Sequence, residues 1–354
     1  MAKVTIRDVA KQAGVSLSTV SRVLNHNPSV DPALAERVRG AAGALGYRPG
    51  IAAWSLPGAQ IALIVPALEN SYFSSIVAGV IDTARANGQS VLVMQTGAKP
   101  EVEESCLQAA LSARVSGIIF SGGGNLVPTE RFPALRDIPL VIAARRQVVP
   151  GVPHVYSDNV GAGYLATKYL LKMRRQNIAL LVNFWTDSIH DYDSFMAAYD
   201  SPAQGACTAF DRFTGYRQAL EEEGLEVMPS LIVFSGFSHE SGYASAQELL
   251  ASFQAFDAVL VSNDRCATGV LRLFREQRIT VPEQVSLICF NGGLISSVVS
   301  PALTMIEQQN YEVGVQSAVQ LNELICGRGA HDVKLDVSLV IKGSTSLAAA
   351  AAGL

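Results

Sequence analysis

A chain of 354 residues is longer than one ordinary hydrophobic core requires, and 49% hydrophobic with 16% charged residues excludes a disordered chain. No apolar run reaches the roughly 18 residues that span a bilayer, and the polar start has no signal-peptide core, so a cytoplasmic protein without a membrane partner is expected. Residues 1–60, which we call the head, carry seven basic and three acidic side chains, a net charge of +4, and the remainder has a net charge of −8. The head is therefore the part of the chain able to bind a polyanion.

The first fifty residues predict three short helices. Thr5 N-caps the first, with Asp8 in its first turn, and Gly14 ends it. Ser16 caps the second helix, and Asp31 followed by proline opens the third. Apolar residues at helical spacing are expected to form one core: Val9, Ala10, Ala13, Val20, Val23, Leu24, Leu34, Val38, Ala41 and Leu45. Three short helices with a glycine-containing turn between the first two are typical of a helix-turn-helix.

The second helix leaves one face for DNA. Leu17 and Ser18 lie at its N-terminal end, which enters the major groove in this motif, and Arg22 follows one turn later with a guanidinium suited to a guanine edge. Short hydrogen-bonding residues on the helix suit phosphate oxygens: Ser16, Thr19, Ser21 and Asn25. A three-helix module that binds no DNA is the alternative that the pattern alone leaves open.

From Ile61 onward, short apolar runs alternate with helical segments such as 101–114 and 213–224. Eight runs rich in Val, Ile and Leu are expected to be strands buried on both faces of parallel sheets: 61–67, 90–96, 117–122, 139–144, 177–184, 231–236, 258–263 and 285–292. Repeated strand–helix units predict an α/β fold of doubly wound parallel sheets in two lobes, with a ligand bound between the lobes at the carboxyl ends of the strands.

The stretches TIRDVAKQAGVSLSTVSRVLN and VDPALAERVRGAAGALGYRPG resemble the DNA-binding head of the lactose-repressor/galactose-repressor (LacI/GalR) family of bacterial transcription regulators. The later stretch SNDRCATGVLRLFREQRITVPEQVSLICFNG is similar to the body of that family, which has a periplasmic-binding-protein-like fold. The resemblance implies a homodimeric repressor of a carbohydrate-catabolism operon. It would bind double-stranded operator DNA under allosteric control by a sugar-like effector, with no cofactor. It also implies that Leu17, Ser18 and Arg22 contact bases, and Thr5 and Tyr47 join the expected DNA-binding residues.

The connector YRPGIAAWSLPG departs from this family. Members of the family have a hinge helix here that inserts leucine side chains of a dimer into the minor groove, so Leu56 is the expected wedge. Gly50 weakens the helix cap, Trp54 replaces a basic residue, and Pro57 bars extension of the helix. We expect a marginal hinge that becomes ordered only on DNA, and packing of Trp54 across the dimer is the alternative.

The resemblance also implies effector contacts near the ends of several strands: Tyr72, Phe73, Arg145, Arg212, Phe237, Asn263, Asp264 and Asn291. Ordinary packing between the lobes is the alternative for Tyr72 and Phe73, and capping of the next helix is the alternative for Asp264.

Three positions favour an acidic effector. Carboxylates are common in the family where this chain has Ala144, Asn291 and Gly292, whereas Arg145 and Arg212 remain. Loss of the acids makes the expected pocket more positive, so a sugar acid or sugar phosphate is the expected effector class.

Domain boundaries follow from these motifs: a head at 1–49, a hinge at 50–60, an effector-binding and dimerisation body at 61–342, and a tail at 343–354. The first lobe is expected at about 61–160 and 291–320, and the second at about 161–290 and 321–342. The expected crossings between lobes lie near 158–161, near Asn291 and near Gln309.

The segment from Trp185 to Arg212 is expected to form a lid at the pocket mouth. His190, Asp191 and Asp193 within it suggest a metal, but no second cluster has ligand spacing and neither do the five cysteines, so no metal is expected. Two other functions stay open. One is a regulator whose body no longer binds a small molecule. The other is an enzyme using the cleft, against which stands the lack of a nucleophile–base pair or phosphate-binding loop in the sequence.

Overall fold

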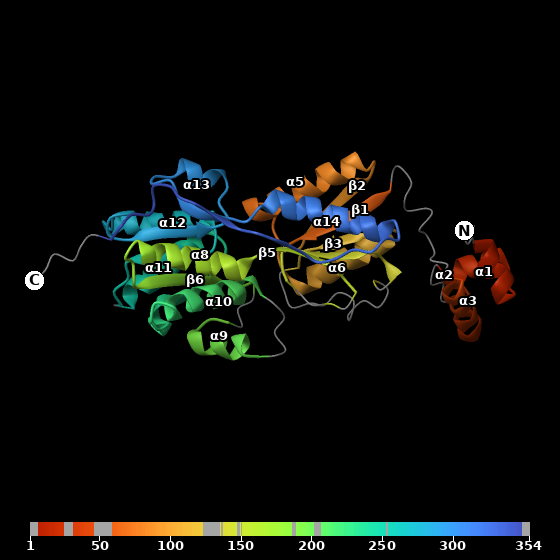
Figure 1. Cartoon of the computed structure of the whole chain (residues 1–354). Helices are drawn as coiled ribbons and strands as arrows, with labels where there is room; N and C mark the ends of the chain where they lie inside the picture. The colour runs from red at the N-terminus through yellow and green to blue at the C-terminus, as the bar shows by residue number, and fades with distance from the viewer. Residues whose placement is uncertain are drawn as a thin grey trace, which may run out of the picture.

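The computed structural model describes residues 6–24, 31–45, 59–122, 135, 137–146, 149, 151–185, 189–201, 207–252 and 254–348. Its head consists of three helices, α1 (Ile6–Ala13), α2 (Leu17–Leu24) and α3 (Pro32–Ala44), as Figure 1 shows. Within the described segments, no helix combines the length and the apolar composition that a membrane crossing requires.

The caps of the head lie where the sequence predicts them. Gly14 ends α1 with a φ of +64°. Ser16 Oγ accepts a hydrogen bond from the Thr19 N–H at 3.1 Å, and Asp31 Oδ1 accepts one from the Leu34 N–H at 3.0 Å. The predicted core is confirmed at seven positions, whereas Leu34 and Leu45 are only half-buried: the buried residues are Val9, Ala10, Ala13, Val20, Val23, Val38 and Ala41.

The first lobe is a sheet of six parallel strands in the order β11-β5-β4-β3-β1-β2. Side chains of β1 point alternately to the two faces of the sheet. Leu63 packs with α5 and α14 on one face, and Ile64 packs with α6 on the other. Both faces are therefore covered, as expected for a parallel sheet. The elements are β1 (Gln60–Val65), α5 (Ser71–Ala86), β2 (Ser90–Gln95), α6 (Pro100–Ser112), β3 (Ile118–Phe120), β4 (Leu140–Ala143), β5 (His154–Ser157), α14 (Asn310–Ile325) and β11 (Val333–Leu335).

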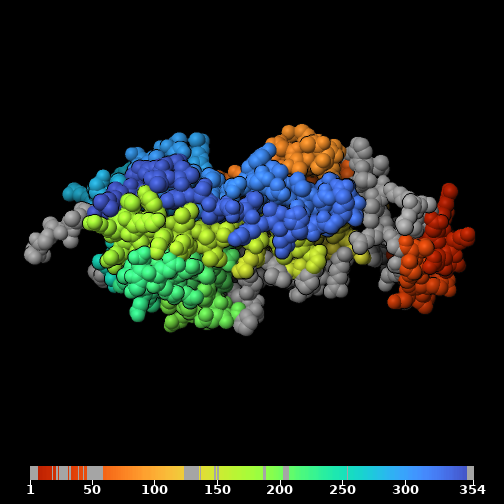
Figure 2. All heavy atoms as spheres, viewed as in Figure 1, coloured from red at the N-terminus to blue at the C-terminus, as the bar shows by residue number. Residues whose placement is uncertain are grey.

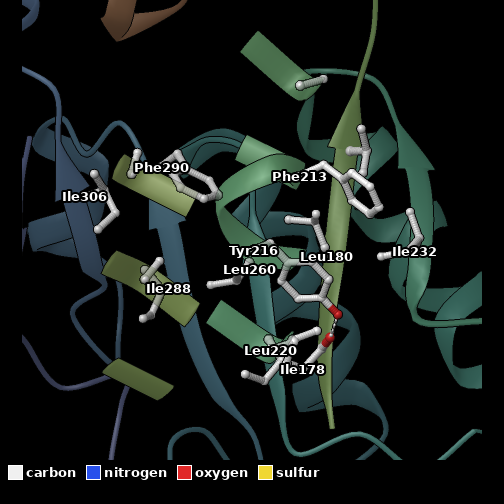
Figure 3. Packing of buried hydrophobic residues seen from close by; sticks show 14 of the residues in the cluster. Ile178, Leu180, Phe213, Tyr216, Leu220, Ile232, Leu260, Ile288, Phe290 and Ile306 are labelled. Carbon is white, nitrogen blue, oxygen red and sulfur yellow. Dashed lines mark hydrogen bonds between the residues drawn. The ribbon is translucent and has the colours of Figure 1, made fainter. Parts of the chain in front are cut away.

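The second lobe is a sheet in the order β12-β10-β9-β8-β6-β7, in which only β12 is antiparallel to its neighbour. Its first core cluster (Figure 3) packs Phe213 and Tyr216 against the sheet, and the Tyr216 hydroxyl donates to the Ile178 carbonyl at 2.8 Å. The elements are α8 (Asn159–Lys172), β6 (Ile178–Asn183), α9 (Tyr192–Tyr199), α10 (Thr208–Glu221), η2 (Pro229–Leu231), β7 (Ile232–Ser235), α11 (His239–Ala251), β8 (Ala258–Val261), α12 (Asp264–Glu276), β9 (Ser286–Phe290), α13 (Leu294–Val298), β10 (Thr304–Glu307) and β12 (Ser338–Val340).

The chain passes between the sheets after β5, after β10 and after β11. The crossing expected near Asn291 is wrong, because β10 pairs in parallel with β9 in the same sheet. Assignment of 291–320 to the first lobe is wrong for β10, and assignment of 321–342 to the second is wrong for β11, which pairs with β5. The C-terminal part of the chain therefore extends over both lobes (blue in Figure 2).

Three helix pairs cross at reciprocal glycines, where backbone meets backbone. A Cβ on Gly163 of α8 would lie 2.0 Å from the Arg212 carbonyl oxygen of α10, and one on Gly215 would lie 2.0 Å from the Val160 carbonyl oxygen. The pairs α5–α14 and α11–α12 cross in the same way, through Gly79 and Gly314 and through Gly242 and Gly269. These crossings hold the helices closer than any side chain would allow.

Candidate DNA-binding face and effector cleft

The exposed face of α2 begins with Leu17, which is 45% exposed although it is a large apolar residue. The Ser16 and Thr19 hydroxyls lie 2.8 Å apart on the same turn. The other expected DNA contacts cannot be placed in the same way. The structure describes no side chain for Ser18, Ser21 or Arg22, and these expected DNA or hinge residues lie outside the described segments: Thr5, Asn25, Tyr47, Gly50, Trp54, Leu56 and Pro57.

Arg212 of α10 lies in the interior between the lobes. Its Nε donates to Asn159 Oδ1 at 3.2 Å, and its two Nη atoms donate to the Ser262 carbonyl at 3.2 Å and to Gln308 Oε1 at 3.1 Å. The guanidinium lies over the Phe290 ring, 4.3 Å from its centroid. Burial lowers the pKa of Arg212 to about 10. Because Asn159 and Gln308 flank two of the crossings, Arg212 ties those crossings to the end of β8.

Tyr72 and Phe73 begin α5 and belong to the first-lobe core. The Tyr72 hydroxyl donates to the Ala144 carbonyl at 3.4 Å, and burial raises the pKa of Tyr72 to about 12. Ala144 itself has a φ of +69°, a left-handed conformation that costs a non-glycine residue about 1 kcal/mol. Most contacts of Tyr72 and Phe73 are therefore packing contacts, as expected under the alternative to effector binding.

Arg145 follows β4 and donates from Nη1 to the Gly122 carbonyl at 3.1 Å. Burial lowers the pKa of Arg145, and the Cys207 thiol and the Glu103 carboxylate act in the opposite direction. This guanidinium therefore already has an acid beside it.

A row of three aromatic rings, which we call the aromatic bridge, joins the lobes. Trp185 stacks on Phe237 with ring centroids 4.0 Å apart and an interplanar angle of 19°. Its indole also lies 6.5 Å from the ring of Phe73, which belongs to the first lobe. The ring of Phe237, expected to stack on a ligand, thus stacks on Trp185, a residue to which sequence reasoning assigned no contact.

Asn263, and not Asp264, caps the helix that follows β8. Asn263 is the N-cap of α12, since its Oδ1 accepts from the Cys266 N–H at 2.7 Å. Capping by Asp264 is therefore wrong. Asp264 Oδ2 accepts from the Gly293 N–H at 3.0 Å and lies 3.5 Å from the Ser71 hydroxyl, which belongs to the first lobe. Burial raises the pKa of Asp264.

Asn291 follows β9 with a φ of +58°, a conformation that asparagine tolerates better than most residues. Its side chain is buried, and its Oδ1 has no hydrogen-bond partner among the described residues.

An ion pair also spans the lobes, with Arg146 Nη2 3.1 Å from Asp211 Oδ1. Burial raises the pKa of Asp211, and Arg146 opposes that change. Carboxylates lie near two of the three arginines, Glu103 near Arg145 and Asp211 against Arg146, whereas Arg212 donates to neutral oxygens. The acidic class of effector stays a prediction.

The segment after Trp185 contains α9, whose Phe195 is fully buried in the second-lobe core, so the expectation of a lid is wrong for this part. Asp191 caps α9 by accepting from the Ser194 N–H at 2.8 Å. Among the described residues, no group of three His, Cys, Asp or Glu side chains is arranged to hold a metal ion.

Two family descriptions match the chain. Residues 59–342 match periplasmic binding proteins and the sugar-binding domain of the LacI family, and residues 5–50 match the bacterial regulatory proteins of the lacI family. The chain is 29% identical to catabolite control protein A of Priestia megaterium, over 88% of this chain and 89% of that protein. It is 30% identical to a ribose operon repressor of Halalkalibacterium halodurans, over 88% of each.

Solved structures agree with this match. The transcriptional regulator CelR in complex with cellobiose has a TM-score of 0.70 and 25% identity over 97% of this chain and all of that one. The lac repressor dimer bound to operator and an anti-inducer has a TM-score of 0.66 and 26% identity over 98% of this chain and all of that one.

A helix-turn-helix head joined to a two-lobed sugar-binding body defines a DNA-binding transcription regulator and not an enzyme. The chain belongs to the LacI family of bacterial regulators.

Proposed function

We propose that this regulator represses a carbohydrate-catabolism operon as a homodimer on operator DNA, and that a sugar-like effector between the lobes controls its operator affinity. One observation supports the proposal above others: two polar contacts join the lobes, namely Arg146–Asp211 and Ser71–Asp264. A ligand that binds there changes the balance between open and closed lobes. Operator and effector affinities are then coupled reciprocally, with either sign of control allowed.

Exposed apolar side chains of the second lobe support the dimer. Leu294 and Val298 of α13 are 79% and 69% exposed, and Ile341 is 59% exposed. Lys342 donates to Ser297 of α13 at 2.8 Å, so these residues lie close together. Large apolar residues that gather on one surface are typical of a protein interface.

A regulator whose body binds no small molecule is the second candidate. The aromatic bridge favours it, since Trp185 lies between Phe73 and Phe237 where a ligand ring would enter. Sugar titration decides between the two candidates, because only the first has an operator affinity that responds to a ligand.

Arg22→Ala tests the DNA-binding role. Operators are first selected from a random duplex library with the unaltered protein. The substitution is then expected to cost about 1–3 kcal/mol in operator affinity and to relax preference at one base pair of each half-site. Arg37→Ala removes the same charge from the exposed surface of α3 and is the control. It is expected to lose less operator affinity than Arg22→Ala, by the same factor for every operator sequence. Unchanged affinity and preference in Arg22→Ala would overturn the assignment.

A further inference from the structure

A cavity of about 460 Å³ opens to solvent at the junction of the lobes, where β5 meets α8 and α10 (Figure 1). Both lobes contribute to its lining. Arg146, Tyr156 and Lys334 belong to the first lobe, and Asp158, Tyr164 and Asp211 belong to the cap and first turns of α8 and to α10. A ligand in this cavity would therefore contact both lobes at once.

The cavity is separate from the expected effector site. None of the eight expected effector residues lines it. Neighbouring residues on a helix point about 100° apart. On α10, Asp211 lines the cavity, whereas Arg212 points into the interior and donates to the Ser262 carbonyl and to Gln308. A ligand in the cavity thus meets different side chains from a ligand in the effector cleft.

Two ion pairs cross the cavity from one lobe to the other. Arg146 Nη2 lies 3.1 Å from Asp211 Oδ1, and Lys334 Nζ lies 2.9 Å from Asp158 Oδ2. The two acids are also close to each other. Burial raises the pKa of Asp211, and the Asp158 carboxylate acts in the same direction while Arg146 opposes both. Cations and acids are therefore interleaved in the lining.

These ion pairs use only part of the hydrogen-bonding capacity of their members. Asp211 is 8% exposed, and its Oδ2 accepts no hydrogen bond from the described residues. Arg146 and Lys334 are about half-exposed, and each donates one N–H group to a described side chain although a guanidinium has five and an ammonium has three. The cavity thus offers a buried acceptor for a cation beside free donors for an anion.

This arrangement of charge selects the class of ligand. A purely anionic ligand would lie beside the buried Asp211 carboxylate, and a purely cationic one would lie beside Arg146 and Lys334. A zwitterion meets both, because its ammonium donates to Asp211 and its carboxylate accepts from Arg146. In an α-amino acid the two charged groups share one carbon atom, which matches an ion pair whose atoms lie 3.1 Å apart.

We propose that this cavity is a second ligand site, which binds a free α-amino acid between Arg146 and Asp211, with its side chain against Tyr156 and Tyr164. The site goes beyond the proposed sugar-like effector and does not depend on it. Because the ligand contacts both lobes, it favours the arrangement in which Arg146 and Asp211 are close. Coupling of this site to operator affinity rests on the proposed control through the lobes.

Calorimetric titration of the full chain with each protein amino acid tests the site. We expect at least one amino acid to bind. Its decarboxylated amine and its deaminated acid are each expected to bind at least roughly tenfold more weakly, the value of one charge-assisted hydrogen bond. Binding by none of the amino acids, or equal affinity for the deaminated acid, would overturn the proposal.

Two tryptophan substitutions test where the amino acid binds. Gln218 lines the cavity from the exposed surface of α10, so Gln218→Trp fills the space with an indole. Gln108→Trp adds the same side chain to the exposed surface of α6 and is the control. We expect at least roughly tenfold weaker binding by Gln218→Trp and unchanged binding by Gln108→Trp. Equal affinities in these two variants, both checked for folding by melting temperature, would place the amino acid elsewhere.

Asp211→Asn separates the charge from the shape of the site. The amide keeps the size of the carboxylate and removes its charge, so the amino acid loses its advantage over the deaminated acid. We expect the ratio of the two affinities to fall from at least roughly tenfold to within about threefold. A merely structural role of Asp211 would weaken both ligands alike, and an unchanged ratio would contradict the proposal.

Operator binding separates this site from sugar control. With no sugar present, the amino acid that binds is expected to change operator affinity about fivefold or more, and unchanged affinity would remove the coupling to DNA. Sugars are titrated separately against Gln218→Trp, in which the cavity is filled. A sugar response there supports the proposed effector control whatever the amino acids do, and its absence counts against that control alone.

Discussion

The glycine crossing between α8 and α10 makes a quantitative prediction for Gly163→Ala. The added Cβ would lie 2.0 Å from the Arg212 carbonyl oxygen, whereas ordinary contact begins near 3.4 Å, so the two helices must separate by more than 1 Å. Overpacking of this kind costs about 1–3 kcal/mol and sometimes more, and the higher helix propensity of alanine returns about 1 kcal/mol. Because the Cβ is fixed to the backbone of one helix and meets a backbone oxygen of the other, neither can rotate away. The steric cost is therefore at the upper end, and the net loss is about 2 kcal/mol.

Differential scanning calorimetry measures this loss. A destabilisation of about 2 kcal/mol lowers the melting temperature of a domain of this size by roughly 4–8 °C. Gly40→Ala is the matched control, since Gly40 is also helical but a Cβ there would meet nothing within 4 Å. It is expected to stabilise the head by up to about 1 kcal/mol. A melting temperature for Gly163→Ala that equals or exceeds that of the unaltered protein would refute the argument.

Three further predictions concern charge and assembly. Arg146→Gln removes the ion pair with Asp211 that spans the lobes, and should weaken effector binding in calorimetry by up to roughly fivefold; equal affinity would show that the pair does not favour closure. Burial raises the pKa of Asp158, but hydrogen bonds from the Gly161 N–H and the Lys334 ammonium lower it below its usual value. These two contacts therefore stabilise the folded protein at neutral pH, and this stabilisation is lost as pH falls through that pKa. Replacing Lys334 by methionine should flatten the fall of melting temperature below about pH 4, and identical profiles would contradict this. Leu294→Glu should raise the dimer dissociation constant at least tenfold in sedimentation, and an unchanged constant would place the dimer interface elsewhere.

Strands with long apolar runs were predictable, because burial on both faces leaves a continuous hydrophobic signal. All eight predicted strands are present, from β1 to β9 without β5. The missed strands are short and lie at or near sheet edges: β5, β10, β11 and β12. Missing β10 caused the wrong crossing near Asn291, since the segment after β9 was then assigned to the first lobe.

The head caps were predictable because Ser16 and Asp31 act through neighbours three residues away. The cleft was harder, because its contacts join residues far apart in sequence, such as Arg146 with Asp211. Trp185 had one available signal, its position just after a predicted strand.

The placement of α14 has a consequence for synthesis. The first five strands of the first lobe leave the ribosome early, but the groove along α5 at Gly79 is filled only by residues near Tyr311 and Gly314. The whole second-lobe segment up to β10 must be translated in between. During translation the nascent first lobe therefore carries an open apolar groove for more than 150 residues, which is the interval in which chaperones and aggregation compete for it.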